Sequence, residues 1–318
     1  MSKILIAHAL DTIDVRDAFF DALYDIMAKD KRVIVLTVDQ GAFSLERIKN
    51  EFPKQYYNVG IAEQNLICVA AGLAMGGQIP FVYGISTFMT MRCYEQIRNN
   101  LCCMNLPVTI IGSGPGYTYG SDGPTHHSIQ DIAIMRALPS MAIYSPVDAT
   151  STSACARMAY EMSGPKYIRL EKGILPVFYQ PGHDFSRGFE ILRFGQDILI
   201  ISTGIMVNRA IEVAEVLSLQ GFKVGVVDIY RLKPVNDALL LEVLSFAKRI
   251  ITLEEHSVIG GIGSVISDLV TDNGLSRPFK KIALPDCYCY EYGNRERLPA
   301  YHRLDVKTVT TSILSWVS

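Results

Sequence analysis

Short apolar runs alternate with amphipathic helical patterns along almost the whole chain, and this alternation occurs twice. In the first half, the runs that read as buried strands are 32–38 (RVIVLTV), 79–83 (IPFVY), 107–112 (PVTIIG) and 141–145 (MAIYS), and the alternation continues as far as 166–170 (KYIRL). Helical patterns lie around and between them at residues 15–29, 62–76, 87–104 and 148–162. Near-continuous apolar strands that alternate with helices predict a parallel sheet that is covered on both faces.

The alternation stops over residues 172–196, where proline, glycine and mixed polar residues are typical of a surface linker. A second series follows, with strands at 197–202, 223–229, 249–254 and 280–284 and helices at 207–219, 236–247 and 262–271. We therefore predict an α/β protein of two domains, residues 1–180 (with the linker from about 172) and 190–318. Each domain is expected to be a mainly parallel sheet flanked by helices.

Composition narrows the class of partner. The chain has 30 Lys+Arg and 32 Asp+Glu, a formal net charge of −2, which argues against nucleic acid as the main partner. No apolar stretch reaches the roughly 18 residues that span a bilayer, and the N-terminal residues do not read as a secretory signal. The seven cysteines form no CxxC pair and favour a reducing compartment. We expect a cytoplasmic protein that binds neither nucleic acid nor membrane.

Three glycine clusters, at residues 112–116, 120–123 and 260–263, are candidates for nucleotide loops. None forms GxGxxG between a strand and a helix, and GxxxxGK[ST] does not occur in the sequence. The third cluster precedes a helix, where it could bind an anion or form a tight turn, and we favour the turn.

Three local patterns carry the candidate chemistry. The first is residues 58–65 (NVGIAEQN), in which Glu63 opens an apolar helix. The second is residues 86–98 (STFMTMRCYEQIR), and the third is residues 120–127 (GSDGPTHH), which places two imidazoles after a turn. Taken alone, each has an ordinary explanation: a helix-dipole carboxylate, a solvated helix face and a capped turn.

Taken together, these patterns resemble the pyrimidine-binding and C-terminal domains of transketolases. More broadly, the chain is similar to thiamine-diphosphate enzymes that include deoxyxylulose-phosphate synthase and the β subunits of 2-oxoacid dehydrogenases. The likeness covers almost the whole chain, and residues 253–264 (LEEHSVIGGIGS) resemble a segment of the family's C-terminal domain.

The resemblance implies thiamine diphosphate as cofactor and assigns roles to five residues. Glu63 corresponds to the catalytic glutamate that hydrogen-bonds the aminopyrimidine ring, Phe88 to the residue that stacks on this ring, and Ile61 to a further cofactor contact. His126 corresponds to a catalytic histidine that exchanges protons with substrate oxygens, and Asp122 to a residue that binds a substrate hydroxyl.

The resemblance also implies side chains that bind a substrate phosphate. They are Arg16, with Ser44 as a weaker match, together with Arg169 and Lys172. At the position where transketolases carry a further histidine, this chain has Gly114. The expected phosphate clamp is therefore incomplete.

The family binds diphosphate and metal through a Gly-Asp-Gly motif followed by Asn, and this sequence contains no Gly-Asp-Gly. We therefore expect no metal on this chain and Mg or Ca on a partner, an N-terminal transketolase subunit, in an α2β2 heterotetramer. The assembly would transfer a two-carbon ketol unit between sugars or sugar phosphates. The alternatives are a subunit like deoxyxylulose-phosphate synthase or 2-oxoacid dehydrogenase E1 beta, and a non-catalytic homologue.

Overall fold

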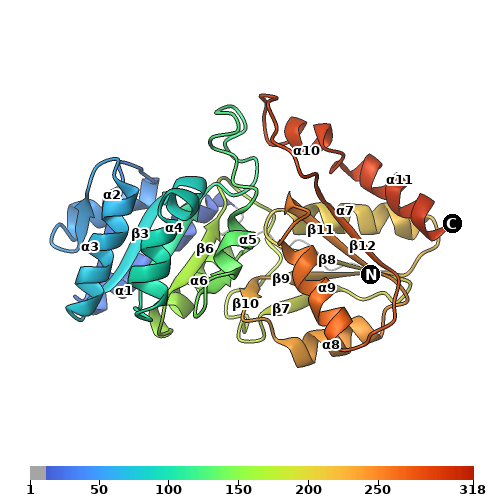
Figure 1. The fold of residues 1–318 in the computed structure, drawn as a ribbon, viewed down its shortest axis with the longest axis horizontal. Coiled ribbons are helices and arrows are strands. Elements are labelled where there is room, and N and C mark those ends of the chain that lie inside the picture. Colours follow the sequence, from blue (N-terminus) through green and yellow to red (C-terminus); the bar gives the residue numbers. More distant parts are fainter. Residues whose placement is uncertain (1–11) are drawn as a thin grey trace. The chain divides into compact units, whose positions relative to one another are not determined.

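The computed structural model describes residues 12–318, which divide into two compact units (Figure 1). One unit extends to Pro115 and resumes over Ile134–Phe185. The other combines Gly116–Ala133 with Ser186–Ser318. The domain boundaries 1–180 and 190–318 remain predictions from the sequence. In the structure, the second unit is built from two separate parts of the chain.

The first unit contains a parallel sheet whose strands are ordered β5-β6-β4-β3-β1-β2. Their bounds are β1 Val33–Thr37, β2 Tyr56–Asn58, β3 Ile79–Ile85, β4 Thr109–Ser113, β5 Ala142–Tyr144 and β6 Lys166–Leu170. Strands β1, β4, β5 and β6 are buried at every residue, which is why the sequence shows continuous apolar runs rather than alternation.

The helices of this unit are α1 Val15–Lys29, α2 Phe43–Glu51, α3 Glu63–Met75, α4 Tyr94–Gln96, α5 Asp131–Arg136, which begins in the other unit, and α6 Ala149–Glu161. Two π-helical segments, η2 Phe88–Arg92 and η3 Ile97–Cys102, flank α4. Helices α1 and α6 pack together, and Phe19 and Phe20 of α1 meet Phe81 and Tyr83 of β3 in the core. This aromatic contact joins helix α1 to the centre of the sheet.

The second unit has a five-stranded sheet of order β12-β11-β8-β9-β7, in which only β7 pairs antiparallel. The strands are β7 Phe189–Arg193, β8 Ile198–Ser202, β9 Val224–Ile229, β11 Ile250–Ser257 and β12 Phe279–Leu284, with a short strand β10 at Arg231–Lys233. The helices are α7 Met206–Leu219, α8 Asp237–Ser245, α9 Ile262–Asp272, α10 Arg297–Tyr301 and α11 Val306–Val317. Both units thus confirm the predicted fold class.

The structure differs from the sequence prediction in several elements. Strand β7 lies inside the segment 172–196, which was predicted to be a linker. The sequence does not reveal this strand, because a single five-residue edge strand gives little signal among glycines and prolines. The predicted helix 87–104 contains two π-helical segments, which share the apolar pattern of an α-helix. Helices α2, α10 and α11 and the short strands β2 and β10 were not predicted.

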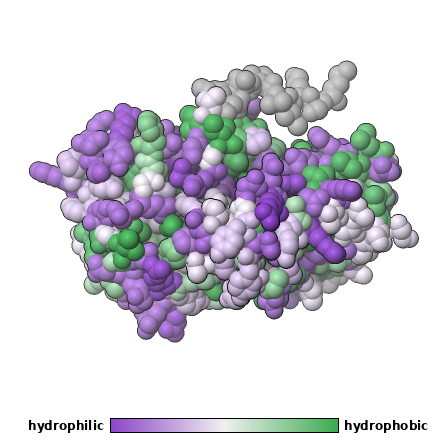
Figure 2. Space-filling model, turned by 90° about the horizontal axis from the view of Figure 1, so that it is seen from above, coloured by the Kyte–Doolittle hydropathy of each residue, from purple (hydrophilic) through white to green (hydrophobic). Residues whose placement is uncertain are grey.

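Among the described residues, no helix is long and apolar enough to cross a membrane. The face drawn in Figure 2 is mostly hydrophilic, and the hydrophobic residues on it form separate patches. Exposed apolar side chains include Phe43, Ile61 and Met75 in the first unit and Phe194 and Phe246 in the second.

Candidate functional site

Glu63 is the first residue of α3, and its side chain is only 4% exposed. Arg92 Nη1 donates to Glu63 Oε2 at 2.7 Å. Across residues 12–318, the other carboxylate oxygen, Oε1, has no protein donor. The position at a helix N-terminus favours a negative charge. A nearly buried carboxylate with one oxygen already held is therefore ready to accept a hydrogen bond from a bound molecule.

Phe88 begins η2, three residues after the last residue of β3. The guanidinium of Arg92, at the end of the same π-helical segment, lies 4.2 Å from the centre of the Phe88 ring. Arg92 thus bridges a carboxylate and an aromatic face, and the structure brings together two of the residues predicted to bind the pyrimidine. We refer to Glu63, Phe88 and Arg92 as the carboxylate–ring cluster. The sequence motif contains Arg92, but its spacing alone suggested no role for this residue.

Ile61 lies two residues before α3 and is 77% exposed. The preceding Gly60 has φ +75°, a backbone conformation that favours glycine. An exposed apolar side chain two residues before a hydrogen-bond acceptor, together with the aromatic ring of Phe88, fits a flat heteroaromatic ring that carries an N–H group. The chain's own residues therefore suit the pyrimidine end of thiamine diphosphate.

Arg16, predicted to bind phosphate, is engaged by a carboxylate of its own chain. Its Nε and Nη2 donate to the two oxygens of Asp14 at 3.2 and 3.0 Å, and Asp14 also accepts the N–H groups of Arg16 and Gly173. Burial raises the pKa of Asp14, but these hydrogen bonds outweigh it and hold the pKa below its ordinary value. The positive charge of Arg16 is therefore largely compensated within the protein.

The other predicted phosphate residues differ in their surroundings. Lys172 is half-buried and immediately precedes Gly173, so the contact of Gly173 with Asp14 brings Lys172 near the start of α1. Ser44 is buried in α2, and its N–H donates to Asp17 at 2.8 Å. Arg169 lies on β6, is 6% exposed and has Nη1 3.5 Å from Ser145 Oγ.

Asp122 and His126 lie in the segment Gly116–Ala133, which belongs to the second unit. Asp122 is exposed, and His126 is half-buried with Nδ1 3.0 Å from Thr125 Oγ1. The neighbouring His127 is buried edge-on against Tyr117, with ring centres 4.8 Å apart, and burial lowers its pKa. Of the two imidazoles, His126 is therefore the one that a substrate can reach.

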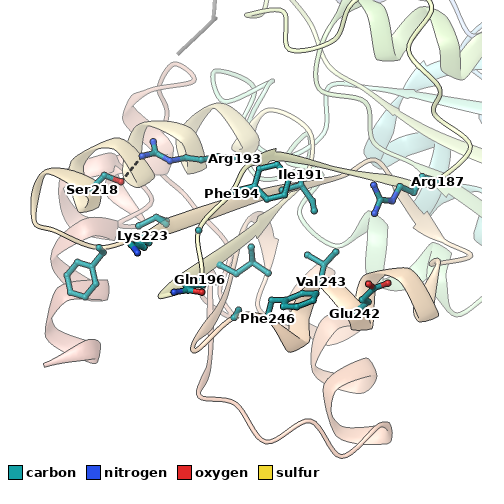
Figure 3. Close-up of a pocket in the computed structure, with 15 residues that line it drawn as sticks. Arg187, Ile191, Arg193, Phe194, Gln196, Ser218, Lys223, Glu242, Val243 and Phe246 are labelled. Carbon is teal, nitrogen blue, oxygen red and sulfur yellow. Dashed lines mark hydrogen bonds between the residues drawn. The ribbon is translucent and has the colours of Figure 1, made fainter. Parts of the chain in front are cut away.

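The second unit also holds a cavity of about 740 Å³ (Figure 3). Figure 3 shows Phe194 and Ile191 on one side and Phe246 and Val243 on the other, while Arg193 turns toward Ser218. No predicted site residue lines it. This cavity is separate from the residues that the sequence motifs single out.

Comparison with known proteins assigns each unit to a known domain family. Residues 11–177 match the transketolase pyrimidine-binding domain, and residues 188–309 match the transketolase C-terminal domain. A solved structure described as a split-gene transketolase, an inactive β4 tetramer, superposes with a TM-score of 0.87 at 34% identity, covering 95% of this chain and 98% of that one.

Three curated relatives give the range of named activities. The 6-deoxy-6-sulfo-D-fructose transketolase subunit of Clostridium sp. is 34% identical over 86% of this chain and 85% of its own length. A subunit of the apulose-4-phosphate transketolase of Phocaeicola vulgatus is 32% identical over 97% of this chain and 99% of its own length. The 1-deoxy-D-xylulose-5-phosphate synthase of Caldanaerobacter subterraneus is 31% identical over 94% of this chain, but only 48% of its own length is matched.

The matches follow the two units along nearly the whole chain, and the carboxylate–ring cluster lies in the unit that matches the pyrimidine-binding domain. The chain belongs to the transketolase family, and its two units carry that family's pyrimidine-binding and C-terminal domains.

Proposed function

We propose that this chain is the C-terminal subunit of a thiamine-diphosphate-dependent transketolase that transfers a two-carbon ketol unit from a ketose to an aldose. An N-terminal partner subunit would carry the diphosphate site and its Mg or Ca ion, in an α2β2 heterotetramer. The observation that carries this proposal is the nearly buried Glu63 beside Phe88, in a chain that matches split transketolase subunits over nearly their full length.

Helix α3 supports a partner surface on the first unit. After its polar first turn it is apolar, yet Val69 and Met75 are exposed on it. Ile61 is exposed two residues before it, and Phe43 is exposed at the start of α2. Apolar side chains of one helix that remain in contact with water favour burial against another chain. This pattern is expected for a subunit that completes its site with a partner.

Each residue of the carboxylate–ring cluster has a defined part in binding the cofactor. When bound, thiamine diphosphate supplies the carbon nucleophile and the electron sink. Glu63 Oε1 would accept a hydrogen bond from the protonated ring nitrogen of the pyrimidine, and Phe88 would offer its ring for stacking, while Arg92 holds the Glu63 carboxylate in place. Ile61, two residues before Glu63, would exclude water from the ring edge.

The residues of the Gly116–Ala133 segment are proposed to act on the substrate. His126 donates and accepts a proton at a sugar oxygen, and Asp122 accepts a hydrogen bond from a sugar hydroxyl. Lys172, Arg169, Ser44 and Arg16 are proposed to bind the far end of the sugar. Because Asp14 already compensates Arg16, a substrate without a phosphate at that end suits this part of the site better than a phosphorylated one.

The test combines this chain with a partner subunit that bears the Gly-Asp-Gly motif, thiamine diphosphate and Mg²⁺, and measures ketol transfer from a ketose donor to an aldehyde. Glu63→Ala should abolish transfer, while Lys54→Ala, at an exposed lysine in the same unit, should retain it. Full transfer by this chain alone would overturn the two-chain proposal. Retained activity of the assembled Glu63→Ala enzyme would overturn the role of Glu63.

A second candidate activity is a condensation like that of 1-deoxy-D-xylulose-5-phosphate synthase, favoured by the 31% identity to that enzyme; the 2-oxoacid dehydrogenase reaction shares its use of a 2-oxoacid. Both release carbon dioxide from pyruvate, whereas ketol transfer from a ketose does not. Carbon dioxide release by the assembled enzyme, with no transfer from a ketose, would select this second group.

A further inference from the structure

Three consecutive ionisable residues at the end of β11 are all buried: Glu254 is 1%, Glu255 6% and His256 0% exposed. They belong to the segment 253–264, for which the sequence suggested a family likeness but no role. Buried charged groups are retained only where hydrogen bonds satisfy them. The partners of these three residues therefore show what the segment does.

Glu254 accepts hydrogen bonds from the N-terminus of helix α9. Its Oε2 accepts the N–H of Ile262 at 2.7 Å, and its Oε1 accepts the N–H of Gly263 at 2.8 Å, at the first turn of α9. A carboxylate at this place satisfies two helix N–H groups and interacts favourably with the helix dipole. The 260–263 cluster is thus occupied by a side chain of the protein.

Glu255 holds the beginning of the segment Gly116–Ala133. Its Oε2 accepts the N–H of Tyr117 at 3.2 Å and pairs with Arg295 Nη1 at 2.6 Å. Gly116 has φ +60°, and a Cβ built there would overlap with the Glu255 carboxylate. Only glycine therefore allows the chain to approach this closely.

His256 and Ser257 hold the other end of the same segment. Ala133 N–H donates to His256 Nε2 at 3.4 Å, and Asp131 Oδ1 lies 4.0 Å from this nitrogen. His256 Nδ1 faces the carbonyl of Ser257 at 2.9 Å, so the hydrogen-bond network assigns the proton to Nδ1 and leaves Nε2 as acceptor. Ser257 N–H donates to the carbonyl of Ile129 at 2.8 Å.

We propose that Glu255 and His256 are positioning residues that fix both ends of the segment carrying Asp122 and His126, and so set where these two side chains meet the substrate. The inference rests on the proposed function, because it assumes that Asp122 and His126 contact the sugar. Neither positioning residue needs to touch the substrate. Their effect passes through the backbone at residues 116–117 and 129–133.

The kinetic test uses the enzyme assembled with its partner subunit, and compares Glu255→Ala with Glu254→Ala. Glu254 is a matched control, since it is the adjacent buried carboxylate and accepts the N–H groups of α9. Glu255→Ala should raise KM for the ketose about tenfold, the loss expected for a charge-assisted hydrogen bond, with the Kd of thiamine diphosphate unchanged. Glu254→Ala should lower Tm and leave KM unchanged.

A second measurement needs no activity and so separates the failure of this inference from the failure of the proposed function. Amide hydrogen exchange of the full chain should speed up across residues 117–133 in Glu255→Ala and His256→Ala, and not in Glu254→Ala. Where Glu255→Ala does not fold, Glu255→Gln keeps an acceptor for Tyr117 N–H and should give a smaller effect in the same direction. Unchanged exchange across residues 117–133 in the folded Glu255 and His256 variants would overturn the inference.

Discussion

Lys166 allows a stability prediction whose sign and size follow from one side chain. It is the first residue of β6 and is 0% exposed. Its Nζ donates to the carbonyl of Met162 at 2.6 Å. Burial lowers the pKa of Lys166 from its ordinary 10.5 to about 8. The charged ammonium is thus held in the core by one neutral acceptor, and the fold is less stable for it.

This difference in pKa makes the stability of the fold depend on pH. Between pH 8 and 10.5 the unfolded chain keeps a proton on Lys166 that the folded chain has released, so the free energy of unfolding rises with pH in this window. The total gain amounts to about 3 kcal/mol, at about 1.4 kcal/mol for each pH unit. Below pH 8 the destabilisation is fully present.

The assay is urea unfolding of this chain at several pH values from 7 to 10.5, for the unchanged protein and for Lys166→Met. The Met variant should be more stable at pH 7 by up to about 3 kcal/mol, and the difference should shrink toward pH 10.5. Burial also raises the pKa of Cys93 to about 12, which lowers stability with rising pH, but this contribution cancels in the difference between the two proteins. Lys54→Met, at an exposed lysine, is the control. A difference that stays constant with pH would refute the reasoning.

Two further predictions concern the ion pairs of the first unit. A double-mutant cycle of Glu63→Gln and Arg92→Gln, measured by urea unfolding, should give a coupling energy of about 1 kcal/mol. The energy is modest because the Arg92 side chain is 43% exposed. A coupling energy of zero would contradict the ion pair between the two side chains. Asp14→Asn removes the carboxylate that pairs with Arg16, and a guanidinium without this partner can bind phosphate. The KM of the assembled enzyme should therefore fall roughly fivefold for fructose 6-phosphate and less for fructose. Equal changes for both sugars would place Arg16 outside the substrate site.

The sequence predicts the elements that are long or wholly buried. Helix α1 matches the predicted range 15–29, because its apolar pattern is regular and Asp14 provides a clear N-cap. Strands β8 and β9 differ from their predicted ranges by one residue, since five or six consecutive buried positions have a strong signal. Strand β7 was hidden because only its first residue is fully buried.

The motifs identified Glu63 and Phe88, but the contacts that control them could not be derived from spacing. Arg92 lies 29 positions from Glu63, and only the fold shows that the two side chains meet. The same holds for Asp14: in the structure it is the N-cap of α1, and the sequence alone does not show that its carboxylate also binds the guanidinium of Arg16. Such pairs depend on side-chain direction as well as on order along the chain.

The two-part construction of the second unit limits how subunits of this kind can be recombined. An exchange of residues 186–318 as one cassette would give the retained Gly116–Ala133 segment a foreign Glu255 and Arg295 to bind. Chimeras between related subunits should therefore keep their activity only when both parts are transplanted together. These contacts define the part of the chain that can be exchanged as a unit. A chimera with a single crossover point cannot exchange both of its segments.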